Sequence, residues 1–165
     1  MSSSKSVKFL AVTLDQHLSM KEHHKNMLRE LKRRTNRFQR ITGSYTKPRL
    51  DTSTCLKILH SMIVPITTYA PTVNCIKSEK QFLEIDSTVR KAARMAIHAP
   101  KSTRNVYTET KAGIQNSKEH TLQLAKSYIS NPDRCPTVQS IVRNHKNMVQ
   151  IHNPTYSTPM DIILG

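Results

Sequence analysis

Glycine, aromatic and acidic residues are scarce in this chain of 165 residues, and tryptophan is absent. The 3 glycines, Gly43, Gly113 and Gly165, lie far apart, so no glycine-rich loop can hold a nucleotide phosphate. The 11 carboxylates include no adjacent pair and no obvious two-metal constellation. We therefore expect no catalytic residues, no cofactor and no small-molecule substrate.

The sequence also lacks the cysteine and histidine patterns that are typical of metal sites and disulfide frameworks. Cys55, Cys75 and Cys135 are odd in number, widely separated and in no C-x-x-C spacing, which argues against a zinc knuckle or a disulfide framework. The pair His23-His24 does not have the i,i+4 spacing of a zinc site. We expect buried thiols, no bound metal, and an intracellular, reducing location, nuclear in preference to cytoplasmic.

Long hydrophobic runs are missing as well. The apolar run Phe9–Leu14 is interrupted by Thr13 and stopped by Asp15, and no other stretch approaches the length of a membrane span. Apolar residues make up 36% of the chain. We expect a modest core and no membrane partner.

Positive charge is the strongest compositional signal. The chain has 26 Lys and Arg against 11 Asp and Glu, a formal net charge of +15. Residues 1–50 carry 12 basic and 3 acidic side chains, a net of +9, and residues 51–165 carry 14 and 8, a net of +6. This balance favours a polyanionic partner such as nucleic acid.

The segment "VKFLAVTLD", Val7 to Asp15, reads as a β-strand because it is rich in β-branched and aromatic residues. A single strand is not stable in water. We therefore expect the rest of its sheet to come from elsewhere.

A long basic helix is predicted next. Ser19 and Glu22 form a potential capping box, and Gly43 a C-terminal stop. Apolar residues recur at helical spacing on one side of the helix: Met20, Met27, Leu28, Leu31, Phe38 and Ile41. Basic residues occupy the opposite side, and those expected to contact phosphates are Lys25, Arg29, Lys32, Arg33, Arg37 and Arg40. Glutamate is nearly absent from that side, so we expect no i,i+4 ion pairs to relieve the repulsion between the cations. Phosphate binding and a solvated face are the two interpretations of this side.

Further helices follow along the chain. Asp51 or Thr52 caps a helix that Pro65 should kink, and Ser78 with Gln81 caps another that ends by Pro100. A loop is expected around 101–116, then a helix from Ser117 to about Ser130 and a last one around 138–148, before a frayed tail. Asp86 is expected to be an exposed helix charge. The predicted fold class is mainly α: a bundle-like fragment with one short N-terminal β-strand or hairpin and an irregular C-terminal tail.

Four stretches of the chain resemble, in order, the reverse transcriptases of non-long-terminal-repeat, jockey-type retrotransposons. "VKFLAVTLD" resembles the family segment "vKfLGVtLD", and "SMIVPITTYAPTVN" is similar to "alvrPvltYgapvW". "VRKAARMAIHAPKSTRN" resembles "qnkaLRmitGAPryvrN", and "AGIQNSKEH" followed by "SNPDRCPTVQSI" resembles two segments near the end of such polymerases. The resemblance spans roughly residues 7–141 and implies the thumb and downstream part of an RNA-directed DNA polymerase.

Several departures from the family pattern limit what the resemblance implies. Ala11 and His98 stand where the family has glycine, and Asn74 where it has tryptophan. The fingers and the palm, which carries the polymerase aspartates, are absent, so the resemblance implies no enzyme activity for this chain alone. The implied organisation is a strand segment left over from a palm or primer-grip region (1–18), a thumb-like helical region (19–110), a C-terminal helical region (111–152) and a tail (153–165).

The expected function is therefore that of a truncated reverse-transcriptase fragment that binds the phosphate backbone of RNA or an RNA–DNA duplex in a sequence-tolerant way. A separate polymerase palm is a further expected partner. The main alternative is a non-enzymatic helical interaction protein or pseudogene product that binds no nucleic acid. A basic helix lying on an anionic membrane is a weaker third alternative.

Overall fold

The structure is a computed structural model that describes residues 6–15, 20–44, 46–74, 77–130 and 140. The fold is mainly α, as predicted, with a short N-terminal β-hairpin. The chain divides into two compact units, one of Met1–Tyr69 with Ser78–Ser117 and the other of Ala70–Lys77 with Lys118–Gly165. The first unit carries the candidate site.

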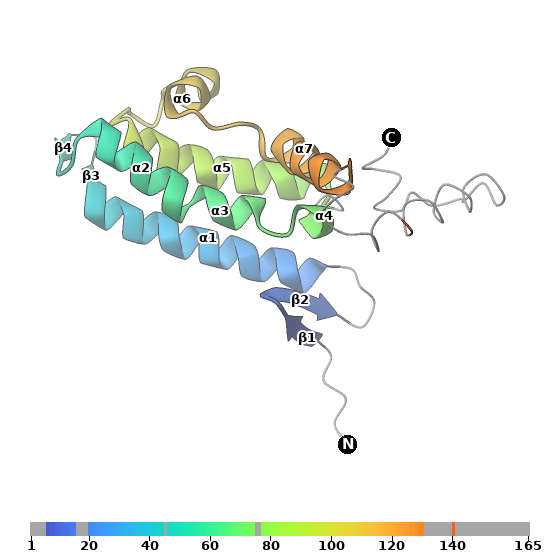
Figure 1. Ribbon diagram of the computed structural model, residues 1–165. Helices are drawn as coiled ribbons and strands as arrows, with labels where there is room; N and C mark the ends of the chain where they lie inside the picture. Colours follow the sequence, from blue (N-terminus) through green and yellow to red (C-terminus); the bar gives the residue numbers. More distant parts are fainter. Residues whose placement is uncertain (1–5, 16–19, 45, 75–76, 131–139, 141–165) are drawn as a thin grey trace. The chain divides into compact units, whose positions relative to one another are not determined.

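Three helical segments form the framework of the first unit, and short elements connect them (Figure 1). The elements of this unit are β1 (Ser6–Phe9), β2 (Val12–Asp15), α1 (Lys21–Thr42), β3 (Gly43–Ser44), β4 (Lys47–Pro48), α2 (Thr52–Met62), α3 (Val64–Thr68), α5 (Glu79–Ala96) and α6 (Asn105–Ala112). Helix α1 packs against both α2 and α5, and α6 packs against α5. In Figure 1, α1 and α5 run in the same direction and α2 runs in the opposite one.

The expectation that Val7–Asp15 is one strand whose sheet comes from elsewhere is wrong, because the segment folds back on itself into two paired strands. Strands β1 and β2 pair antiparallel with Phe9 opposite Val12, which leaves the two-residue turn Leu10-Ala11. Both turn residues have positive φ, 44° and 64°, as a two-residue type I′ hairpin requires. Val12 is buried and β2 contacts α1, whereas every residue of β1 is exposed. Of the two strands, β2 is thus the one that packs against the helices.

Helix α1 starts differently from the prediction and ends as predicted. Its N-cap is Met20, with φ of 56° and no side-chain capping bond, so the capping box expected from Ser19 and Glu22 is wrong. Ser19 itself lies outside the described residues. Gly43 forms the C-cap at φ 83°, and its N–H donates to the Gln39 carbonyl. A Cβ at Gly43 would lie 2.5 Å from the Lys47 carbonyl oxygen, so this stop needs glycine.

Two further caps agree with the sequence. The Asp51 carboxylate accepts from the Thr54 N–H at 2.9 Å at the start of α2, and Ser78 forms the predicted capping box with Gln81 at the start of α5. The helix predicted to kink at Pro65 is divided instead at Ile63, between α2 and α3. Pro65 lies in the first turn of α3, where its missing N–H has no partner to lose.

The core lies where α1, α2 and α5 meet. Its largest fully buried side chains include Phe38, Leu31 and Leu59. On α5 the small residues Ala92, Ala93 and Ala96 are fully buried, which lets neighbouring backbones approach closely. Some of the predicted apolar stripe lies outside this core: Leu28 and Met20 are only partly buried and Ile41 is exposed.

The expected loop before Ser117 contains the helix α6, whose exposed residues include Val106 and Tyr107. Asp86 is buried rather than exposed, because its carboxylate accepts the Ser117 N–H at 3.0 Å. Both predictions were therefore wrong.

The second unit contains α4 (Pro71–Asn74) and most of α7 (Ser117–Ser130). Helix α7 matches its prediction. The helix predicted around 138–148 and the tail lie outside the described residues, apart from the helical Ser140.

Candidate nucleic-acid interface

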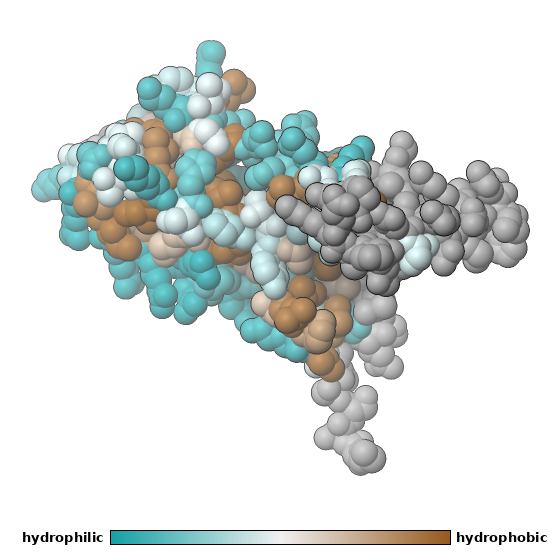
Figure 2. All heavy atoms as spheres, viewed as in Figure 1, coloured by the Kyte–Doolittle hydropathy of each residue, from teal (hydrophilic) through white to brown (hydrophobic). Residues whose placement is uncertain are grey.

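All six basic residues predicted to contact phosphates lie on α1, and all are exposed: Lys25, Arg29, Lys32, Arg33, Arg37 and Arg40. They are placed there because the core takes the opposite side of the helix, through Met27, Leu31 and Phe38. From Lys25 to Arg40 the helix rises about 22 Å at about 1.5 Å per residue. Figure 2 shows hydrophilic side chains along this part of the molecule.

Ion pairs do form on this face, contrary to the prediction. Both Glu30 carboxylate oxygens accept from Arg33, at 2.8 and 2.9 Å, and one also accepts from Arg34 at 2.9 Å. These two guanidinium groups hold the pKa of Glu30 at about 2, and the contact raises the pKa of Arg33. Arg34 also donates to the Met62 carbonyl at 3.1 Å, which ties α1 to the end of α2. Arg33 is therefore the least available of the six cations.

Four of the six cations form no ion pair or side-chain hydrogen bond with any described residue: Lys25, Lys32, Arg37 and Arg40. Arg29 donates to the Asn26 side chain at 3.3 Å, and Asn26 in turn donates to Thr13 of β2 at 3.4 Å. The surface formed by these four residues, called the α1 face below, has charge that no carboxylate of the described residues neutralises.

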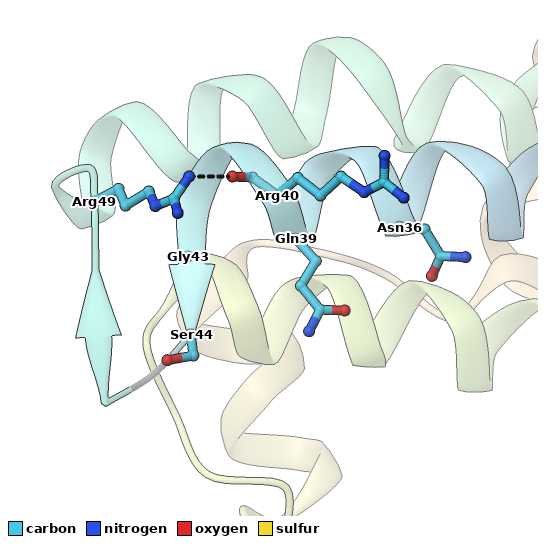
Figure 3. Close-up of a pocket in the computed structure, with 6 residues that line it drawn as sticks. All are labelled: Asn36, Gln39, Arg40, Gly43, Ser44 and Arg49. Atoms are coloured by element: carbon cyan, nitrogen blue, oxygen red, sulfur yellow. Dashed lines mark hydrogen bonds between the residues drawn. The ribbon is translucent and has the colours of Figure 1, made fainter.

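A shallow hollow lies at the C-terminal end of this face (Figure 3). It is lined by Asn36, Gln39, Arg40, Gly43, Ser44 and Arg49. Arg49, which follows β4, donates to the Arg40 carbonyl at 3.0 Å and so covers a helix-end oxygen with a cation. The β3–β4 turn thereby adds an exposed basic residue beside α1, and none of the described lining residues carries a carboxylate.

A second hollow lies at the other end of α1, where the hairpin and α3 meet the helix. Its lining includes Lys8, Arg29, Arg33, Arg34 and Glu30. The Tyr69 hydroxyl donates to the Leu10 carbonyl at 2.6 Å across this region and fixes the hairpin turn. Because Glu30 lies in this hollow, a carboxylate offsets part of the positive charge of its lining.

Histidine and cysteine positions suggest structural roles. His23 and His24 are buried, the Thr13 N–H lies 3.4 Å from His23 Nδ1, and His24 Nε2 lies 3.5 Å from a Glu84 carboxylate oxygen. Cys55 is buried, and burial raises the pKa of its thiol. Within the ranges that the structure describes, no group of three or more His, Cys, Asp or Glu residues could hold a metal ion. Cys75 and Cys135 lie outside those ranges.

Two features of the interface were not predicted from the sequence, namely the ion pairs of Glu30 and the position of Arg49. The i,i+3 and i,i+4 spacing of Glu30 with Arg33 and Arg34 could have revealed the ion pairs. The position of Arg49 beside Arg40 could not have been found, since it depends on the β3–β4 turn.

No protein-family model, curated protein or solved structure matches this chain. Among the helices in the described part of the chain, none has the length and hydrophobicity that crossing a membrane requires.

Proposed function

We propose that the chain is a thumb-like fragment of a retrotransposon-type reverse transcriptase, and that its α1 face binds the phosphate backbone of RNA or an RNA–DNA duplex. The observation that carries the binding proposal is the α1 face itself, with four exposed cations on one helix that pair with no carboxylate in the part of the chain that the structure describes. Cations that gain no ion pair on folding are available to phosphates. Contacts with phosphates position a protein but read no sequence, so binding should be sequence-tolerant.

The proposed origin draws on the sequence resemblance and on two backbone positions. Ala11 and His98 replace glycine of the family pattern, and both have positive φ, 64° and 51°. Glycine adopts this conformation readily, whereas other residues are strained in it. By itself the fragment should not polymerise, because the palm aspartates are absent, and primer extension with magnesium or manganese tests this.

The binding experiment removes charge from the α1 face without shortening side chains. The variant K25Q/R37Q/R40Q lowers the net charge by three and keeps good helix formers on an exposed surface. The matched control K57Q/K80Q/K111Q removes three exposed lysines from α2, α5 and α6. Affinity for an RNA–DNA hybrid should fall far more in the first variant, with the slope of log affinity against log salt reduced by about three or somewhat less.

Equal effects of the two triple variants, at unchanged helical content, would contradict the proposal. The result would then favour a second candidate, a helical interaction protein that binds no nucleic acid. One observation favours that candidate: Val7, Phe9 and Leu10 of the hairpin are exposed, and Figure 2 shows an apolar patch over the hairpin.

A further inference from the structure

A groove of about 780 Å³ runs between the C-terminal halves of α1 and α5. It adjoins the hollow of Figure 3, with which it shares Asn36, Gln39, Gly43 and Ser44. In Figure 3, the Gln39 and Ser44 side chains project from α1 and β3 on the side that α5 occupies. The groove is therefore next to the α1 face but enclosed by a second helix.

The charged residues described in the lining of this groove are all basic. They are Lys32, Lys91, Arg94 and Lys101, and no aspartate or glutamate is among the described lining residues. The three lysines are exposed and form no ion pair or hydrogen bond with any described residue. Arg94 differs, because its guanidinium donates to the Thr103 carbonyl at 3.1 and 3.2 Å and so holds the loop after α5. Three unpaired ammonium groups around one hollow repel one another, and a bound anion would relieve that repulsion.

The Thr35 side chain supplies an independent indication. Thr35 lines the groove, is only 1% exposed, and its hydroxyl oxygen has no hydrogen-bond partner among the described residues. A buried hydroxyl without a partner is costly, so such a group calls for an explanation. Threonine in a helix populates two χ1 rotamers, and rotation between them moves the hydroxyl to a different position around Cβ. The hydroxyl can thus donate to an anion seated in the groove.

The remaining lining indicates which anion fits. The side chains of Asn36, Gln39, Ser87 and Thr88 add neutral hydrogen-bond donors, and none of the described residues that line the groove is an aromatic that could stack on a base. Donors and cations without an aromatic platform match phosphate oxygens rather than nucleobases. We propose that the groove between α1 and α5 is a phosphate-binding site that takes a backbone phosphate of the nucleic acid. This inference rests on the proposed function and extends it from the α1 face to a site shared with α5.

One pair of variants tests the charge. K91Q/K101Q removes two groove lysines and leaves the α1 face intact, and K57Q/K111Q removes two exposed lysines elsewhere as a control. Binding of an RNA–DNA hybrid and of its methylphosphonate analogue, whose backbone is neutral, is measured against salt. For wild type we expect tight binding of the hybrid only. K91Q/K101Q should lower hybrid affinity by about tenfold or more at 0.1 M salt and reduce the salt slope by about two, well beyond the control.

A second pair tests the hydroxyl and separates binding from folding. T35V replaces a buried unpartnered hydroxyl with a methyl group, so its melting temperature should rise while hybrid affinity falls by about fivefold. T35S keeps the hydroxyl and loses a buried methyl group, so its melting temperature should fall while affinity stays unchanged. A purely structural threonine would leave hybrid affinity unchanged in both variants.

The outcomes distinguish this inference from the proposed function. If K91Q/K101Q binds like its control and T35V binds like wild type, the groove site is overturned, and the proposed function stands provided that K25Q/R37Q/R40Q still weakens binding. If the wild-type chain does not bind the hybrid, both are overturned as nucleic-acid sites. If titration with inorganic phosphate then shifts the NMR signals of Thr35, the groove is a site for small phosphates, and the proposal that it takes a backbone phosphate of nucleic acid is refuted.

Discussion

Glu30 forms ion pairs with Arg33 and Arg34 on the basic helix α1, and its replacement by glutamine tests this arrangement of charges. A fall in the pKa of Glu30 from 4.5 to about 2 corresponds in full to about 3 kcal/mol, at about 1.4 kcal/mol per pH unit. The Glu30, Arg33 and Arg34 side chains are 31%, 56% and 38% exposed, so solvent screens the pairs. We therefore expect E30Q to reduce the free energy of unfolding by about 1 kcal/mol at pH 7.

The pH dependence has a defined sign. The pKa of Glu30 is lower in the folded state, so its stabilising effect is complete above about pH 4.5 and is lost as the pH falls towards 2. Denaturant unfolding of wild type and E30Q should differ at neutral pH and converge near pH 2. Equal stabilities at pH 7, or a difference that persists near pH 2, would refute this assignment of the pKa shift.

The same change should strengthen binding, because it frees Arg33 and Arg34. E22Q is the control, since it adds the same charge to α1 but releases no arginine. The salt slope for an RNA–DNA hybrid should steepen by about one to two in E30Q and by less in E22Q. If both variants bind equally tightly, the two arginines do not reach phosphates even when they are freed.

Two further predictions concern the hairpin. A11G should raise the free energy of unfolding by about 0.5–1 kcal/mol. The left-handed conformation costs alanine about 1–2 kcal/mol, and glycine gives back about 0.5–1 kcal/mol of that gain through its larger loss of chain entropy on folding. Denaturant titration measures the difference, and a less stable A11G would contradict the turn geometry. The amides of β1 and β2 should exchange with solvent faster than those around Ala92 and Ala96, because only one strand of the hairpin rests on α1; protection of the hairpin equal to that of α5 would refute this.

Local signals in the sequence identified much of the fold. Asp51, Ser78 and Gly43 act within a few residues of their positions, so their capping roles could be predicted from the sequence. Helix α6 could not, because its buried residues, Thr108 and Ala112, give no apolar periodicity while Val106 and Tyr107 are exposed.

One part of the candidate site could be predicted from the sequence, and another part could not. The exposed side of α1 follows from the helical period, and all six predicted cations lie on it. The groove depends on α1 lying beside α5, which brings Lys32 and Lys91 to one hollow although they are far apart in the sequence. No local pattern encodes that juxtaposition.

The exposed strand β1 has a consequence for the behaviour of the protein in solution. One edge of β1 pairs with β2, and no described residue pairs with its other edge, beside which Val7 and Phe9 are exposed. Such edges promote association between molecules, and a net charge of +15 opposes it through mutual repulsion. Salt shortens the range of that repulsion to about 10 Å at 0.1 M. High-salt conditions that strip nucleic acid from the chain are therefore the ones in which strand-edge aggregation is least restrained.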